Sequence, residues 1–239
     1  MAQCNYQAER LFKEGQQLYG RKSYGEASKK WEHAALSGHA ASHAVLSDML
    51  VCGKPDLPEN HKRAFELAIC GASMGCAHSM GALGRLFQSG FGVAENLSKS
   101  YALGYESAVA GSCFGQYVVG AAFHWGLGVA QDKTEAARWY RLAAAQGHAC
   151  AQYGLGDILE YGGGDAQDMT EAVRWYGLSA AQGDKHAQFK MGYLLHYGQG
   201  VQRNKTEAAR WYTLAAAQGH SIAHKKLKSL RIKRFSKRT

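Results

Sequence analysis

The chain has 239 residues, two prolines and a formal net charge of +9 at neutral pH. No apolar run approaches the roughly 20 residues that a transmembrane helix needs, and residues 1–10 are too polar for the core of a secretory signal. The scarcity of proline, the strongest helix breaker, favours an all-helical fold. We therefore expect a cytoplasmic protein with neither a signal peptide nor a membrane span.

The six cysteines form neither a CxxC motif nor a regular series along the chain. A disulfide-stabilised secreted domain would repeat its cysteine spacings, and a thiolate zinc site would pair its cysteines closely. We therefore interpret the cysteines as structural thiols in a reducing compartment. They are Cys4, Cys52, Cys70, Cys76, Cys113 and Cys150.

Residues 5–39 are predicted to form an N-terminal helical hairpin. Gly15, Ala27, Trp31 and Ala34 follow one another at separations of 12, 4 and 3 residues, and a tight turn is expected near Gly20. This spacing is similar to that of the tetratricopeptide repeat. We interpret the hairpin as a cap, because the end units of a repeat array must expose one face to water.

Between residues 40 and 220 the sequence repeats with a period of about 36 residues. Such a period indicates stacked helical units, each of which buries its apolar face on the next unit. We predict five repeats, at residues 40–76, 77–112, 113–148, 149–184 and 185–220. The recurring residues are Gly75, Gly111, Gly147, Gly183 and Gly219; Asn60, Asn96, Asp132, Asp168 and Asn204; and Trp139, Trp175 and Trp211.

Each repeat is expected to contain two helices, here called its A helix and its B helix, joined by a glycine turn. In the last repeat the A helix has one apolar face from Ala187 onward and ends before Gly198. Gly192 lies inside this helix, and we expect a neighbouring helix to approach it too closely for a Cβ atom. The B helix should start after Asn204, an expected N-cap, and end before Gly219.

One set of residues recurs together, and its fourth copy reads Leu155-Gly156, Gly162-x-Gly164, Asp168, Glu171-Ala172, Trp175-Tyr176 and Ala180-Ala181-Gln182-Gly183. This set resembles the Sel-1-like repeat, a helix-turn-helix unit of the tetratricopeptide superfamily. The resemblance implies an all-α, right-handed α-solenoid whose A helices line a concave face that binds peptides or partner domains. We therefore expect a non-enzymatic scaffold or adaptor for protein partners.

The candidate partner-binding residues are the variable positions of the A helices. Trp125, Tyr161 and Tyr197 stand one period apart, where nothing in the repeat requires an aromatic ring. Such amphipathic rings are enriched at protein interfaces, and the alternative is that they pack on the following repeat. The full set is Arg85, Gln88, His124, Trp125, Asp157, Glu160, Tyr161, Tyr193, His196 and Tyr197.

Metal binding and catalysis are less favoured by the sequence. His124 and His196 lie two repeats apart, with no carboxylate or thiolate at ligand spacing. Some members of the family that the repeat resembles are described as weak hydrolases, which keeps hydrolysis as an alternative. No Ser-x-x-Lys, Gly-x-Ser-x-Gly or His-Glu-x-x-His motif nominates a catalytic residue. We predict no catalytic residue, no metal and no cofactor.

Most of the net positive charge lies in a C-terminal segment, residues 221–239, whose first ten residues are predicted to form a final helix. Three interpretations stay open: a solvated helix end, a nuclear targeting segment, or a patch for nucleic acid or an anionic membrane surface. The last is our alternative function for the protein. The basic residues are Lys225, Lys226, Lys228, Arg231, Lys233, Arg234, Lys237 and Arg238.

Overall fold

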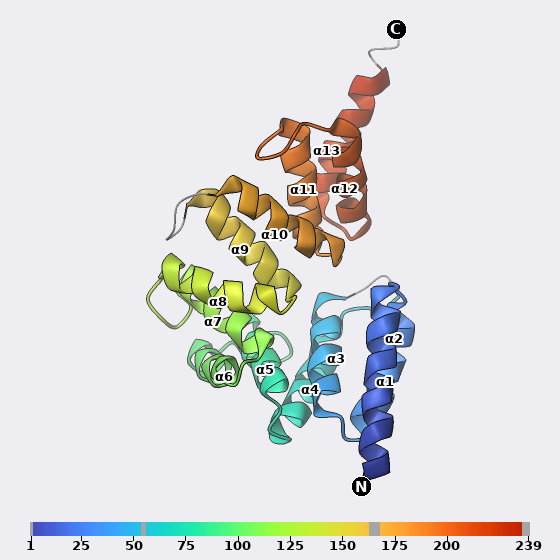
Figure 1. The fold of residues 1–239 in the computed structure, drawn as a ribbon, viewed down its shortest axis with the longest axis vertical. Coiled ribbons are helices and arrows are strands. Elements are labelled where there is room, and N and C mark those ends of the chain that lie inside the picture. The colour runs from blue at the N-terminus through green and yellow to red at the C-terminus, as the bar shows by residue number, and fades with distance from the viewer. Residues whose placement is uncertain (1, 54–55, 163–167, 236–239) are drawn as a thin grey trace. The chain divides into compact units, whose positions relative to one another are not determined.

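The computed structural model describes residues 2–53, 56–162 and 168–235, with side chains described between Tyr6 and Ser229. These residues form thirteen α-helices and no strand, which confirms the predicted all-α repeat fold (Figure 1). The chain divides into two compact units, Met1–Gln131 and Asp132–Thr239.

After the N-terminal hairpin, A helices and B helices alternate along the chain up to α12 (Lys205–Ala217). The first unit contains α1 (Ala2–Gly20), α2 (Tyr24–Leu36), α3 (Ala40–Cys52), α4 (His61–Ser73), α5 (Ala77–Ser89), α6 (Leu97–Val109) and α7 (Cys113–Trp125). The second contains α8 (Lys133–Ala145), α9 (Ala149–Tyr161), α10 (Met169–Ala181), α11 (Lys185–Tyr197), α12 (Lys205–Ala217) and α13 (Ser221–Phe235). The A helices are α3, α5, α7, α9 and α11, and the B helices are α4, α6, α8, α10 and α12.

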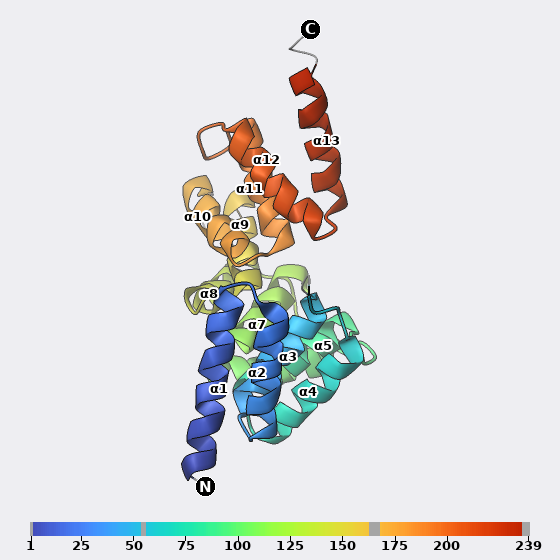
Figure 2. The same cartoon turned by 90° about the vertical axis from the view of Figure 1, so that its right-hand side faces the viewer.

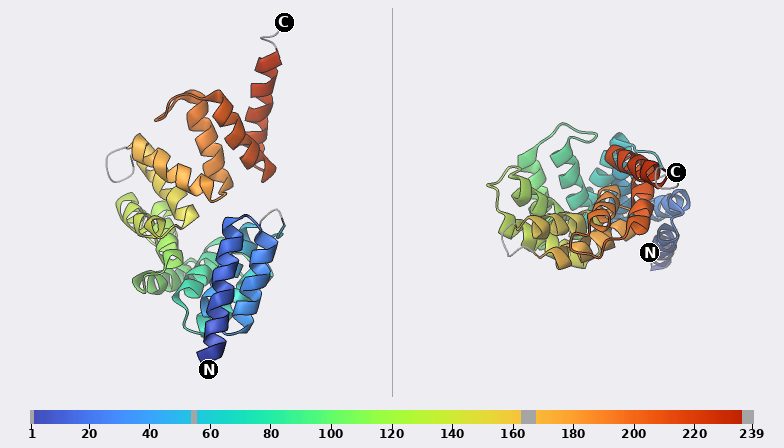
Figure 3. Two further views of the ribbon diagram at one scale, coloured as in Figure 1. Left: turned by 45° about the vertical axis from the view of Figure 1, so that its right-hand side comes forward. Right: turned by 90° about the horizontal axis from the view of Figure 1, so that it is seen from above.

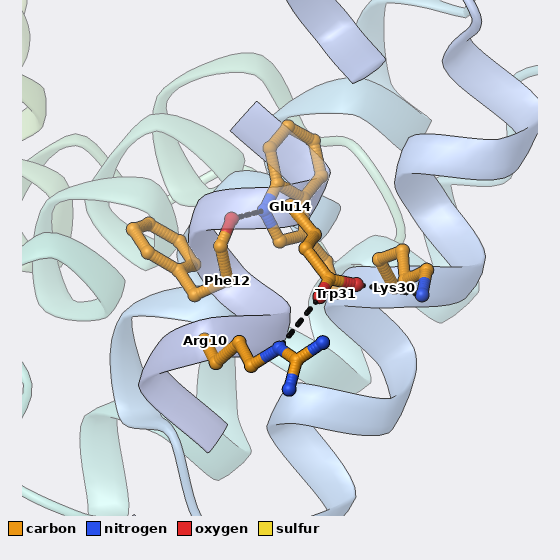
Figure 4. A network of polar contacts seen from close by, with 5 residues as sticks. All are labelled: Arg10, Phe12, Glu14, Lys30 and Trp31. Atoms are coloured by element: carbon orange, nitrogen blue, oxygen red, sulfur yellow. Dashed lines mark hydrogen bonds and ion pairs between the residues drawn. The ribbon is translucent and has the colours of Figure 1, made fainter. Parts of the chain in front are cut away.

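The N-terminal hairpin consists of α1 and α2, which lie side by side (Figures 2 and 3). Trp31 of α2 is buried, and its Nε1 donates a hydrogen bond of 3.0 Å to the carbonyl oxygen of Phe12 (Figure 4). Gly15 makes room for this ring, because a Cβ atom there would lie 2.4 Å from Trp31 Nε1. Lys30 bridges to Glu14 at 2.7 Å, so both apolar and charged contacts join the two helices.

Every B helix begins at an Asn or Asp whose side chain accepts a backbone N–H of the first turn. In α12, for example, Asn204 Oδ1 accepts from the N–H of Glu207 at 3.0 Å. This bond satisfies one of the donors that a helix start leaves without an intrahelical partner. The N-cap predicted at Asn204 is thereby confirmed, and the equivalent residues Asn60, Asn96, Asp132 and Asp168 cap their helices in the same way.

Glycines end the A helices α5, α7, α9 and α11 in a left-handed conformation, with φ between 66° and 76°. Glycine adopts this conformation without a Cβ clash, which explains its recurrence at that position. The second turn glycine also has positive φ at Gly92, Gly128 and Gly200. Its counterpart in the fourth repeat, Gly164, lies outside the described residues.

Two buried tyrosines occupy the centres of the last two repeats. A Cβ atom on Gly156 would lie 2.9 Å from Cδ1 of Tyr176, and one on Gly192 would lie 2.7 Å from Cδ1 of Tyr212. Both tyrosines are fully buried. The expected close approach at the A-helix glycines is therefore confirmed, and the approaching group is a ring of the B helix.

Glutamine side chains tie successive repeats together in the second unit. Gln182 Nε2 donates to the carbonyl oxygen of Gly147 at 2.9 Å and to Oε1 of Gln152 at 2.8 Å. The next repeat reproduces this pattern, since Gln218 Nε2 donates to Gly183 O and to Gln188 Oε1, each at 2.9 Å. We call these four residues the glutamine ladder.

In the first unit small residues allow the same stacking. Helix α5 packs against both α3 and α7, its counterparts in the neighbouring repeats. A Cβ atom on Gly81 would lie 2.4 Å from the backbone nitrogen of Gly115, so two helix backbones nearly touch there. Ser107 adds a hydrogen bond of 2.5 Å from its hydroxyl to the carbonyl oxygen of Ala77.

The last helix, α13, packs beside α12 (Figure 2). It extends to Phe235 and is longer than the predicted helix over residues 221–230. Its buried Ala223 joins the apolar cluster of Ala208, Tyr212 and Ala215. The start of α13 thus covers the apolar face of the fifth repeat.

Candidate functional site

Three exposed rings mark the ends of successive A helices. Trp125, Tyr161 and Tyr197 are the last residues of α7, α9 and α11, and 64%, 65% and 46% of their respective surfaces are exposed. Each is followed by a glycine in the left-handed conformation, which ends the helix at the ring. Trp125 belongs to the first unit, whereas Tyr161 and Tyr197 belong to the second.

The residue that precedes each ring is turned toward the interior of the protein. His124 and Glu160 are buried, and His196 is half-buried. The imidazoles stack on the rings that follow them, with centroids 4.2 Å apart for His124 and Trp125 and 4.6 Å apart for His196 and Tyr197. We therefore place these three residues beneath the exposed surface, where they support the rings.

In the fourth repeat, Glu160 is the centre of a buried ionic network. Lys190 of α11 forms an ion pair of 2.8 Å with Glu160, and the hydroxyl of Tyr176 donates to the same carboxylate oxygen at 2.7 Å. Lys190 also donates to the hydroxyl of Tyr161 at 3.1 Å, with its ammonium 5.1 Å from the centre of that ring. The exposed ring of Tyr161 is therefore fixed to the next repeat.

Burial and charge shift the pKa values within this network. Burial, reinforced by the hydrogen bond to Glu160, raises the pKa of Tyr176 far above its ordinary value. For Lys190 burial alone would lower the pKa, but the hydrogen bonds to Glu160 and Tyr161 outweigh it and leave the pKa raised. Tyr176 thus stays neutral and Lys190 stays charged at physiological pH.

Asp157 lies one helical turn before Glu160 and is half-buried. Burial raises the pKa of its carboxyl group, the charge of Lys190 opposes this shift, and the charge of Glu160 adds to it. Asp157 and Glu160 therefore both belong to the electrostatic surroundings of Lys190.

A lysine contacts the ring at the end of α11 in the same way, but the residues around this second contact differ. Lys226 of α13 donates to the hydroxyl of Tyr197 at 2.9 Å. Its ammonium lies 5.3 Å from the ring centre of Tyr197 and 5.9 Å from that of Tyr193. The two tyrosine rings are themselves 4.6 Å apart. The structure thus brings together the predicted ring site and one residue of the predicted basic segment.

The candidate residues of the second repeat, Arg85 and Gln88, are largely buried within the chain. The guanidinium of Arg85 pairs with Asp48 of the preceding A helix, and its Nη2 lies 3.3 Å from Cys52 Sγ. Only 12% of the Arg85 side chain is exposed. Gln88, in the position of Glu160, is half-buried. Neither residue is an exposed anchor comparable to the rings of the later repeats.

The basic segment is described in part. Lys225 and Lys228 are exposed on α13, whereas Lys226 is half-buried against the tyrosines. The backbones of Arg231, Lys233 and Arg234 continue this helix, but their side chains lie outside the described part of the chain. Lys237 and Arg238 lie outside the described residues altogether.

The described residues contain neither a cluster of metal ligands nor a membrane-spanning helix. No three His, Cys, Asp or Glu side chains there are grouped to hold a metal ion. Likewise, no described helix combines the length and the apolar character that crossing a bilayer would require.

Lys190 is absent from the predicted site residues, and Lys226 is predicted only as part of the basic segment, although both lysines hold tyrosine rings. Each follows its ring by 29 residues, because Lys190 lies on α11, the A helix of the next repeat, and Lys226 lies on α13, the helix that follows the fifth repeat. The two lysines are one period apart, so the signal was present in the sequence. It goes unnoticed because each lysine by itself has the ordinary spacing of a solvated helix face.

The comparisons with known proteins agree with this architecture. The Sel1 repeat model matches residues 40–76, 77–110, 114–148, 151–184 and 185–220. A Sel1 repeat protein from Oxalobacter formigenes is 28% identical, with a TM-score of 0.62 and coverage of 92% of this chain and 89% of that chain. No curated protein matches the chain by sequence.

Two other solved structures are similar. One, called c5321, is described as a protective antigen present in uropathogenic Escherichia coli strains with an SLR fold. It is 26% identical, with a TM-score of 0.58 over 92% of this chain, which spans about half (48%) of that protein. A sel1 repeat protein from Klebsiella pneumoniae is 20% identical over 85% of this chain and 99% of its own, with a TM-score of 0.57, and is similar in fold alone.

Proposed function

The chain belongs to the Sel1 repeat family, whose members are generally protein-interaction scaffolds, and we propose that it binds protein partners through the exposed rings at its A-helix ends. In this proposal the protein is an adaptor without a catalytic step of its own. The anchors are Trp125, Tyr161 and Tyr197. The bound partner is a protein or peptide segment that contacts Trp125 in the first unit or Tyr161 and Tyr197 in the second.

The exposure of these three rings carries the proposal. Large aromatic residues dominate binding energy at protein interfaces, because they bury much area at a low cost in conformational entropy. Tyr161 and Tyr197 contact a lysine of a following helix, yet each of the three rings still has about half or more of its surface exposed. Partner contact is the function that best accounts for it.

The contacts that hold the three rings in place favour tight binding. Tyr161 and Tyr197 each accept a hydrogen bond from a lysine of the next repeat, and Trp125 stacks on His124. A side chain that is already held in place loses less conformational entropy when a partner binds. The buried and half-buried candidates, Glu160 among them, therefore contribute by positioning the rings.

Replacing Trp125, Tyr161 and Tyr197 together by Ala should abolish partner capture. Interface rings commonly contribute about 2 kcal/mol or more each, whereas substitutions at exposed sites change stability by only about 0.5 kcal/mol. The measurement is affinity capture from native cells, with bound proteins identified by mass spectrometry and the melting temperature recorded in parallel.

A matched control uses Leu142, Leu178 and Leu214, which also recur at one period and are 51%, 50% and 44% exposed. These leucines lie on the B helices α8, α10 and α12. Their replacement by Ala should leave capture intact. If the leucine variant loses the partner while the ring variant keeps it, the partner binds the B helices and the proposal is wrong.

A second proposal concerns the exposed lysines of α13. Lys225 and Lys228 lie on a helix without any acidic residue, an arrangement suited to phosphate groups. Binding to duplex DNA should then weaken when both are changed to Gln, and the slope of log affinity against log salt should fall by about one per lysine. Unchanged DNA affinity in this variant would remove the proposal.

A further inference from the structure

A contact between a lysine and a tyrosine ring occurs twice in the second unit, and the two copies differ in the number of carboxylates near the lysine. In both, a lysine of a later helix donates to the ring that ends an A helix: Lys190 of α11 to Tyr161 of α9, and Lys226 of α13 to Tyr197 of α11. The ammonium-to-ring distances are nearly the same, 5.1 Å and 5.3 Å. The two lysines therefore occupy equivalent places in the repeat.

The carboxylates around the first lysine have no counterparts around the second. Lys190 forms an ion pair with Glu160 and interacts electrostatically with Asp157. One period later, Tyr193 takes the place of Asp157 and His196 takes the place of Glu160. The fifth repeat thus keeps the cation and loses both anions.

No other part of the described chain replaces these anions. Between Lys185 and the C-terminus, Glu207 is the single acidic residue in the sequence, and it pairs with Arg210 at 3.2 Å. Among the described residues no carboxylate forms an ion pair with Lys226. Its ammonium lies over the rings of Tyr193 and Tyr197, and its neighbours in sequence include Lys225 and Lys228 but no acidic residue.

The contacts of the Lys226 ammonium among the described residues are one hydrogen bond and two rings. An ammonium group has three N–H donors, and the hydroxyl of Tyr197 accepts one of them. The rings of Tyr193 and Tyr197 hold the group by cation–π attraction but neutralise no charge. A carboxylate that approaches Lys226 beside these tyrosines would gain an ion pair with a cation that is already in position.

We propose that Lys226, Tyr193 and Tyr197 bind a glutamate or aspartate side chain of an acidic partner segment. This carboxylate would supply to Lys226 the charge that Glu160 supplies to Lys190. The inference rests on the proposed function, because it gives the chemistry of the partner at the last ring. The internal pairing in the fourth repeat favours a carboxylate over a phosphate as the occupant.

The probe is a short peptide in which Glu alternates with Leu, acetylated and amidated at its ends, together with the same peptide containing Gln. Titration of the full chain, followed by NMR, should shift the signals of Tyr193, Tyr197 and Lys226 in a saturable manner with the Glu peptide alone. Lys226→Gln should weaken binding about tenfold, as expected for loss of a charged hydrogen bond. Lys228→Gln, with the same charge change on the same helix, should alter it by about twofold at most.

A second variant tests the inference without removing the lysine. His196→Glu restores the carboxylate that the fourth repeat contains, and this carboxylate should pair with Lys226 and exclude the peptide. The melting temperature should stay the same or rise, which separates blocked binding from misfolding. The reverse change, Glu160→His, is not needed, because it would disturb the buried Tyr176 hydroxyl as well.

Several outcomes would overturn the inference. They are equal losses for Lys226→Gln and Lys228→Gln, equal binding of the Gln peptide, no saturable binding, and undiminished binding by the folded His196→Glu variant. Displacement of the peptide from these tyrosines by duplex DNA or by phosphatidylglycerol vesicles, which carry phosphate and no carboxylate, would assign the site to phosphate instead. If ring substitution abolishes partner capture but Lys226→Gln leaves it intact, the proposed function stands and the acidic segment does not.

Discussion

At the scale of single residues, Tyr176 and Tyr212 show how one position can have two energetic roles. Both are fully buried B-helix tyrosines packed on an A-helix glycine. The hydroxyl of Tyr176 donates to Glu160, whereas the hydroxyl of Tyr212 has no partner among the described residues. A buried hydroxyl without a hydrogen bond destabilises the folded state, because the loss of its hydrogen bonds to water is not compensated.

Removing the two hydroxyls should therefore have opposite results. Tyr176→Phe should destabilise the protein by about 1–3 kcal/mol, because it takes a hydrogen bond from a buried carboxylate. Tyr212→Phe should be neutral or slightly stabilising. Urea unfolding of both variants gives the comparison, and equal losses of stability would mean that the Tyr212 hydroxyl is satisfied in solution.

The sequence predicts which side chains of the site are rings but not which candidates are buried. Tyr161 follows the glycine periodicity and could be placed at a helix end from the sequence alone. Glu160 is its neighbour, yet a rotation of about 100° per residue turns it inward. Its burial depends on Lys190 and Tyr176, which lie 30 and 16 residues away.

At the scale of helices, the sequence determines where each element starts and ends. Asn204 and Gly198 act through their own local chemistry, as an N-cap and a left-handed C-cap, so their positions need no tertiary information. The glutamine ladder is different. Gln182 follows an Ala-Ala pair as an ordinary helix-terminal residue, and its partners appear only when repeats stack.

Loss of one ladder residue should weaken the contact between repeats. Gln182→Ala leaves the Gln152 amide oxygen and the Gly147 carbonyl without this donor, at an expected cost of about 1 kcal/mol. Gln199→Ala is the control, because Gln199 is exposed in a turn. Denaturant unfolding should separate the two variants, and equal midpoints would show that water replaces the ladder at no cost.

At the scale of the whole molecule, the period predicted five repeats, and the family match falls on the same stretch of the chain. The division into two compact units after Gln131 could not be predicted. It falls within a matched repeat, between α7 and α8, where the period continues unchanged. Periodicity reports which residues share a role, whereas the extent of a compact unit depends on contacts between many side chains.

Function at this scale arises from differences between copies of a repeated scaffold. Caps, turn glycines and buried tyrosines recur and build the helices, whereas the residues at the A-helix ends change from copy to copy. The exchange of Asp157 and Glu160 for Tyr193 and His196 is one such change. Partner selection in this account depends on those positions.

Hydrogen–deuterium exchange of the full chain, with and without its captured partner, tests this claim most directly. Slowed exchange should appear at the C-terminal ends of α7, α9 and α11 and at the start of α13, where the rings and Lys226 lie. Helices α10 and α12 should exchange at the same rate in both states. Protection confined to these B helices, with none at the A-helix ends, would contradict the account.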